Sequence, residues 1–163
     1  MEYEHAVSVY FHFIGVGLLV TLMVSGTILE MNYRNAATLQ DKALLLRVGK
    51  QIGIISPFAI LLLLLTGIGN MHSLDIGVFT FGWLTAKIIF YAIAAISGVT
   101  FGITARKRGA LVGKMLKGEA PANADELLKG YNKQVTLFHI VLDLLFFIIL
   151  ALAVYGRHGG GQS

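Results

Sequence analysis

Four ionisable residues lie inside long apolar stretches of this sequence: His12, Lys87, His139 and Asp143. A charged side chain at the centre of a bilayer costs about 3 kcal/mol or more unless it finds a partner. Residues of these types at such depths typically transfer protons, ligate a cofactor or form ion pairs. We therefore treat all four as candidate functional residues.

Lys87 and Asp143 are expected at similar depths in the membrane. A helix rises about 1.5 Å per residue, which places Lys87 about 13 Å from one end of its span and Asp143 about 12 Å from the opposite end of its own. Two interpretations remain open. Either the two form an ion pair that locks neighbouring helices together, or they line a polar pocket that serves protons, a quinone or a tetrapyrrole.

His139 precedes Asp143 by four residues, so both side chains lie on one face of a helix. A catalytic hypothesis makes these two residues a polar relay, with Lys87 as a source of charge or of a proton. The structural alternative is that His139 simply donates a hydrogen bond to Asp143 or to a backbone carbonyl.

His12 has two competing interpretations. As a ligand of haem iron it needs an apolar slot and either a second axial ligand or a vacant position. His72, near the end of the second apolar stretch, is the candidate second ligand. In the alternative, His12 is a packed polar residue bonded to Lys87 or Thr85.

The elements that carry these residues are predicted to be membrane-spanning helices. Hydrophobic residues make up 56% of the 163 residues and charged residues only 13%, whereas soluble domains carry about 25% charge. The apolar residues form four blocks, each close to or above the roughly 20 residues that a helix needs to cross a bilayer core. The blocks are 7–31, 51–71, 78–104 and 135–156.

These blocks predict an all-α membrane protein, an antiparallel four-helix transmembrane bundle. Only helices or closed barrels can span, because each backbone polar group needs a partner within the lipid, and the blocks lack the alternation of strands. We expect one domain, residues 1–158, followed by a disordered tail, 159–163. The absence of cysteine excludes disulfides, thiolate metal sites and cysteine nucleophiles.

The positive charges indicate the orientation of the chain. Eleven of the thirteen Lys and Arg residues fall between blocks one and two or between blocks three and four. The positive-inside rule then predicts that both basic loops are cytoplasmic and both termini are outside, in a bacterial inner membrane. The expected partner of these charges is the lipid bilayer, with its anionic headgroups, and no nucleic acid.

Small residues predict faces where helices pack closely. They occur as Gly49-x-x-x-Gly53, as Gly98-x-x-x-Gly102, and as Ser8, Gly15 and Gly26 near His12. Pro57 is expected to kink the second span, because proline removes a helical hydrogen bond.

Three short motifs resemble a known superfamily. They are Tyr10-Phe11-His12-Phe13-Ile14-Gly15, Leu65-Thr66-Gly67 and Gly82-Trp83-Leu84-Thr85-Ala86-Lys87. Together with the order of the spans, they resemble the HemJ and CopD-like superfamily of small polytopic membrane proteins. In HemJ-type protoporphyrinogen oxidases a first-span histidine and a third-span lysine matter for activity and the protein binds haem b; His12 and Lys87 occupy those positions. The first span here ends in Asn32-Tyr33-Arg34-Asn35, where the family carries a Tyr-His pair.

Two hypotheses of different classes follow. In the first, the protein is a haem-b-associated, redox-active membrane protein, a HemJ-like oxidoreductase that exchanges electrons and protons with a reduced tetrapyrrole or quinol. His12 is then the axial ligand, with His72 as the second candidate. In the alternative, the chain is a non-catalytic accessory subunit of a larger respiratory or photosynthetic complex, or a homo-oligomer. Copper uptake is disfavoured because the five methionines form no ladder of soft ligands.

Overall fold

The computed structural model describes residues 2–158, and this part of the chain consists of α-helices without any strand. Four helical stretches are long and apolar enough to cross a membrane, the second of them built from two consecutive helices. The predicted all-α membrane fold is therefore confirmed. The predicted tail, residues 159–163, lies outside the described residues. The helices are α1 (Glu2–Asn35), α2 (Leu39–Gly53), α3 (Ile55–Ser73), α4 (Gly82–Lys117) and α5 (Ala124–His158).

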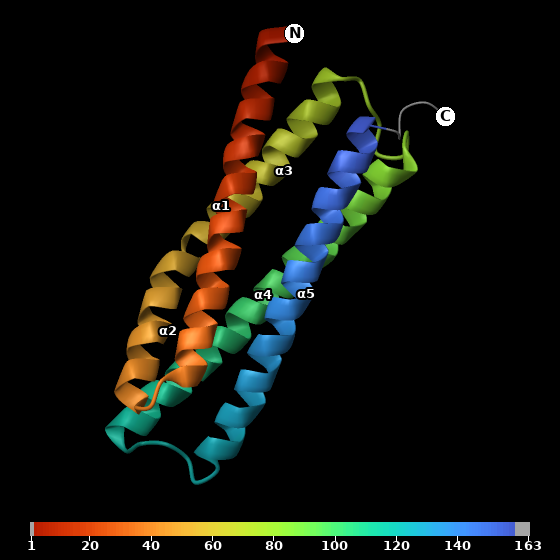
Figure 1. The fold of residues 1–163 in the computed structure, drawn as a ribbon. Coiled ribbons are helices and arrows are strands. Elements are labelled where there is room, and N and C mark those ends of the chain that lie inside the picture. The colour runs from red at the N-terminus through yellow and green to blue at the C-terminus, as the bar shows by residue number, and fades with distance from the viewer. Residues whose placement is uncertain (1, 159–163) are drawn as a thin grey trace.

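The spans run alternately down and up the bundle and form two layers (Figure 1). In one layer α1 packs along α3 and, less extensively, along α2; in the other α4 packs along the whole of α5. The α1–α2 and α4–α5 connections lie at one end, called the basic end below. The start of α1, the end of α5 and the α3–α4 loop lie at the other, called the terminus end (Figure 1).

The helices extend well beyond the predicted spans, because polar residues expected in loops continue them. Residues 39–50 belong to α2, whose start is capped by the Thr38 hydroxyl, which accepts a hydrogen bond from the Asp41 amide at 3.1 Å. Residues 105–117 continue α4, which ends at Gly118 with φ of 72°. Only glycine adopts this left-handed conformation without strain, so it stops the helix.

The second span is interrupted where Pro57 predicts a kink. Helix α2 ends at Gly53 and α3 begins at Ile55, with Ile54 between them. Pro57 has no N–H to donate, and its ring crowds the carbonyl four residues earlier, at Gly53. The amide of Ile54 bonds instead to Gln51 at 3.4 Å, which tightens the last turn of α2.

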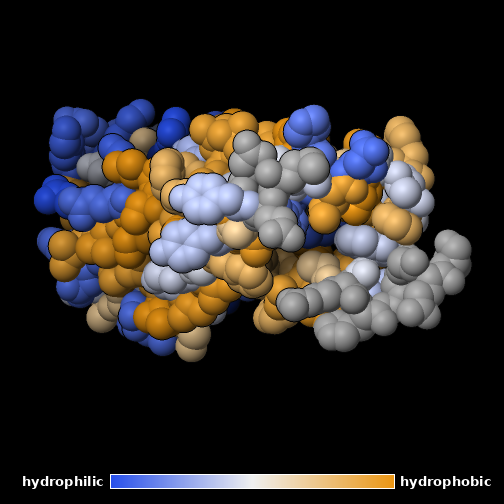
Figure 2. Space-filling view, turned by 90° about the horizontal axis from the view of Figure 1, so that it is seen from above, coloured by the Kyte–Doolittle hydropathy of each residue, from blue (hydrophilic) through white to orange (hydrophobic). Residues whose placement is uncertain are grey.

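The best-packed apolar core lies at the basic end rather than between the spans. Leu111, Val112, Ala124 and Leu128 are buried there, from α4 and α5, and residues of α2 such as Leu46 pack against them. Along the spans, large apolar side chains are exposed on every helix. Figure 2 shows hydrophobic side chains over much of the surface visible from the terminus end. These exposed apolar flanks, on spans of this length, identify an integral membrane protein.

Close packing through small residues occurs at only some of the predicted positions. A Cβ atom at Gly15 would lie 2.9 Å from Leu63 of α3, and one at Gly26 would lie 3.2 Å from the His139 ring. At Gly53, Gly98 and Gly102, by contrast, a Cβ would meet nothing within 4 Å. Close packing is therefore found at Gly15 and Gly26 of α1, whereas no other helix of the described residues comes within 4 Å of a Cβ position at Gly98 or Gly102.

Candidate functional site

The strongest polar interaction of the structure joins α1 to α4 near the basic end. The Arg108 guanidinium donates two hydrogen bonds to the Glu30 carboxylate, from Nη1 to Oε1 at 3.1 Å and from Nη2 to Oε2 at 2.8 Å. Glu30 is 8% exposed and Arg108 5%. This two-pronged geometry is the strongest form of charge-assisted hydrogen bond, and it lies where water is largely excluded.

Further side chains from α1 and α5 complete this Glu30–Arg108 centre. The Tyr33 ring, only 2% exposed, lies 4.3 Å from the Arg108 guanidinium carbon, a cation–π contact. Asn132 of α5 accepts a longer hydrogen bond from Arg108 at 3.5 Å. Arg34 Nε donates to Glu30 at 3.4 Å, and its Nη2 donates to the Thr136 hydroxyl. The buried Tyr33 hydroxyl and Arg108 Nε have no hydrogen-bond partner among the described residues.

His139 lies beside this centre and within electrostatic range of Asp143. Its ring meets Phe101 edge-on, with centroids 4.9 Å apart, and it packs closely against α1 at Gly26. Glu30, Arg108 and Asp143 all act electrostatically on this imidazole. The structure thus brings His139 and Asp143 together, as their spacing indicates, although neither expected hydrogen bond of His139 forms.

His12 belongs to a separate site in the terminus half. Its Nδ1 lies 2.9 Å from the Thr66 hydroxyl, and that hydroxyl donates to the Leu62 carbonyl at 2.6 Å. Because the only hydroxyl hydrogen is used there, Thr66 must accept from His12 Nδ1–H. The lone pair of the neutral ring is therefore on Nε2, which is the state of a metal-ligating histidine.

The partners predicted for His12 and Lys87 differ from those in the structure. The Thr85 hydroxyl donates to the Val78 carbonyl at 2.8 Å, and the partner of His12 is Thr66. Lys87 acts electrostatically on His12. No ion pair joins Lys87 to Asp143 in the described part of the chain, since Asp143 interacts with His139 instead. The charges that lock helices together are Glu30 and Arg108.

The structure does not bring His72 to His12. His72 is exposed and follows Thr66 by six residues, which places it about 9 Å further along α3 and on another side of that helix. The histidine that meets the end of α3 is His5, whose Nδ1 lies 3.0 Å from the Ser73 hydroxyl. A role for His72 in cofactor binding stays a prediction.

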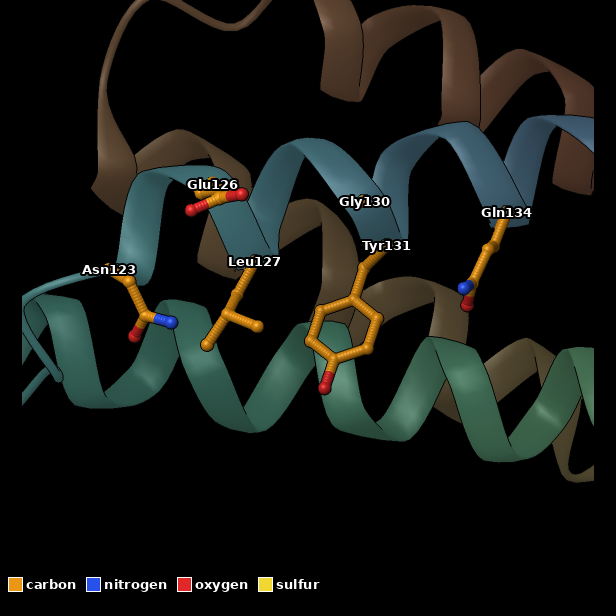
Figure 3. A pocket seen from close by; sticks show the side chains of 6 residues that line it. All are labelled: Asn123, Glu126, Leu127, Gly130, Tyr131 and Gln134. Carbon is orange, nitrogen blue, oxygen red and sulfur yellow. The ribbon is translucent and has the colours of Figure 1, made fainter.

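Within residues 2–158, no group of three or more His, Asp or Glu side chains is arranged to hold a metal ion. Ligation by one or two histidines, as in haem proteins, needs no such group. One surface hollow of about 280 Å³ lies at the basic end, far from His12. Figure 3 shows its lining along the first turns of α5, with the Tyr131 ring directed toward α4.

Comparison with known proteins yields no match: no family model, no curated protein and no solved structure is similar to this chain. The site is therefore interpreted from its own geometry.

Sequence reasoning missed the Glu30–Arg108 centre. Glu30 lies at the end of the first apolar block, where water is within reach, and Arg108 lies in the segment that the sequence predicts to be a loop. The available signal was a carboxylate flanked by Leu29 and Met31 and followed by Tyr33 and Arg34. Its partner, 78 residues away, has no sequence signal of its own.

Proposed function

We propose that this membrane protein binds haem b through His12 and exchanges electrons and protons with a reduced tetrapyrrole or quinol, as its resemblance to HemJ-type proteins implies. The observation that carries the proposal is the His12–Thr66 hydrogen bond, which presents the Nε2 lone pair for ligation. Among the described residues, His12 is the side chain that would hold the haem iron, through Nε2. Bound haem would supply one-electron redox chemistry.

In this proposal Lys87 supplies positive charge beside the haem, and His139 and Asp143 of α5 transfer protons. Lys87, half-buried and within electrostatic range of His12, attracts a carboxylate such as those that tetrapyrroles carry. His139 and Asp143, with the Glu30–Arg108 centre, form a polar route from the basic end. His139 contacts α1 at Gly26, which lies fourteen residues after His12. His139 is therefore about 21 Å from His12 along the bundle.

The test is a reduced-minus-oxidised visible spectrum of protein purified in mild detergent, with a pyridine haemochrome assay. We expect a b-type spectrum, with haem stoichiometric with the chain. His12→Ala should abolish the spectrum while the protein still inserts, and His72→Ala should keep it. Colourless protein, purified from cells with ample haem, would overturn the proposal. Loss of haem in His72→Ala would instead support ligation of the haem by both His12 and His72.

The alternative is a non-catalytic subunit of a larger membrane complex. It is favoured by α4, where no described residue of another helix comes within 4 Å of a Cβ position at Gly98 or Gly102 and the neighbouring Ile96 and Val99 are exposed. Such a stripe allows the backbone of another helix to approach. This alternative predicts that the protein leaves a mild-detergent gel-filtration column with larger partners, or as a homo-oligomer, and is colourless when alone.

For orientation, we propose a bacterial inner membrane with the basic end in the cytoplasm and both termini outside. Support comes from the charges. Nearly all Lys and Arg residues lie near the α1–α2 and α4–α5 connections, and these two connections lie at the same end of the bundle (Figure 1).

A further inference from the structure

A groove of about 380 Å³ lies at the basic end where α1 approaches α5. Its lining combines two cations with apolar side chains. Arg34 comes from α1, whereas Lys133, Thr136, Leu137 and Ile140 come from α5. No acidic residue lines it.

Arg34 is held in place across this groove. Its Nε contacts Glu30 at 3.4 Å and its Nη2 donates to the Thr136 hydroxyl, which in turn donates to the Asn132 carbonyl at 2.9 Å. The side chain is nevertheless 50% exposed. A guanidinium has five N–H donors, so most of them remain free to bind a ligand.

The groove carries an excess of positive charge. The Glu30 carboxylate is already held by both arms of Arg108 and can offset only part of the Arg34 charge. Lys133 is exposed and has no ion-pair partner in the part of the chain that the structure describes. A ligand with a negative charge would therefore complement this site.

The apolar part of the groove continues along α5 toward the middle of the span. Leu137 and Ile140 are about as exposed as Leu144 and Phe147, which follow at helical spacing, each near 60%. The four form one stripe on the helix surface. Cations at the end of a span and an apolar stripe leading into the membrane match a headgroup and its acyl chain.

We propose that this groove is a binding site for one anionic phospholipid. Arg34 and Lys133 bind its phosphate from two helices, and an acyl chain lies along the stripe from Leu137 to Phe147. Because Arg34 also contacts the Glu30–Arg108 centre, the bound lipid would fasten α1 to α5, two helices that otherwise make few contacts. The site is independent of haem binding by His12.

The test is native mass spectrometry of delipidated protein in neutral detergent, titrated with phosphatidylglycerol or with phosphatidylcholine of the same acyl chains. We expect one phosphatidylglycerol per chain to bind in preference to phosphatidylcholine. Arg34→Gln/Lys133→Gln should weaken this binding about 30-fold at low ionic strength, roughly fivefold per cation. The matched control, Arg106→Gln/Lys117→Gln, removes the same charges from exposed positions of α4 and should bind as the wild type does.

Separate arms distinguish a lipid from free phosphate. Inorganic phosphate and glycerol phosphate should neither compete nor raise the melting temperature, because they lack the acyl chain. If the double variant fails to fold, Lys133→Glu, which breaks no described contact, should still lower affinity at least tenfold. Equal binding of phosphatidylcholine, equal loss in the control variant, unchanged binding in Lys133→Glu, or competition by free phosphate would overturn the proposal.

Discussion

At the residue scale, Glu30 and Arg108 show how a buried charge is tolerated in a mostly apolar protein. Each neutralises the other through two hydrogen bonds, and the Tyr33 ring covers the guanidinium. Removing both charges costs little in comparable sites, whereas removing one leaves the other buried without a partner. The pair therefore has a clear signature in mutants.

We predict that Glu30→Leu lowers the free energy of unfolding by about 3–5 kcal/mol, because it leaves the Arg108 charge unpaired. Glu30→Leu/Arg108→Met should recover most of this loss. The measurement is thermal unfolding in detergent, with Glu119→Gln, in the exposed α4–α5 loop, as the control for loss of one carboxylate. A Glu30→Leu protein as stable as this control would contradict the structural role of the pair.

Thr66 offers a second test at this scale, for the proposed haem site. Thr66→Val keeps the shape of the side chain but removes the oxygen that accepts from His12 Nδ1–H. Loss of such a supporting partner typically costs 10- to 100-fold in affinity for the metal group, and we expect a comparable drop in haem affinity. Haem titration of the apoprotein measures it. Thr66→Ser, which keeps the hydroxyl, should behave like the wild type; equal affinities in all three would show that the hydrogen bond does not support ligation.

At the scale of elements, the α1–α3 contact depends on the absence of a side chain at Gly15. An added Cβ would lie 2.9 Å from Leu63 Cγ and 3.0 Å from its Cδ2, closer than packed atoms tolerate. Gly17, on the same helix, has nothing within 4 Å of its Cβ position. The two glycines form a matched pair.

We therefore expect Gly15→Ala to destabilise the protein by about 1–3 kcal/mol, the usual cost of overpacking. Gly17→Ala should be neutral or stabilising by up to about 1 kcal/mol, since alanine favours helix more than glycine does. Thermal unfolding of both variants in the same detergent compares them. Equal melting temperatures would mean that α1 and α3 do not pack as closely as described.

At the scale of the whole molecule, the layer of α1, α2 and α3 meets the layer of α4 and α5 mainly near the basic end. There α2 contacts α4 and the Glu30–Arg108 centre links α1 to α4 and α5. Further along, the Tyr91 hydroxyl donates to the Ile60 carbonyl at 2.6 Å and ties α4 to α3. The proposed haem site, at His12, lies in the terminus half of the bundle, whereas the proposed lipid site lies at the basic end.

The proposed orientation predicts which end reacts with reagents outside the cell. The chain has no cysteine, so Thr80→Cys at the terminus end and Glu119→Cys at the basic end, both at exposed positions, introduce one thiol each. In intact cells a membrane-impermeant maleimide should label Thr80→Cys, and should label Glu119→Cys only after permeabilisation. The reverse pattern would show that the basic end faces outward.

The number and the helical nature of the spans follow from the sequence alone. The length of an apolar block is a local property, and lipid leaves its backbone groups no partners other than those of a helix. The break near Pro57 is also a local property, because the proline ring crowds the carbonyl of Gly53, four residues earlier in the same segment. The spacing of His139 and Asp143 likewise places them on one face without reference to any other helix.

Only the tertiary structure decided which polar groups meet. Helix rotation and tilt determine whether Lys87 is near Asp143 or near His12, and a sequence-based estimate of depth contains neither. Glu30 finds Arg108 across 78 residues because α4 continues past its apolar block, and that extension is stabilised by packing of Leu111 and Val112 against α2 and α5. The length of each apolar span is thus determined by its own segment of sequence, whereas the pairing of charges depends on contacts between segments.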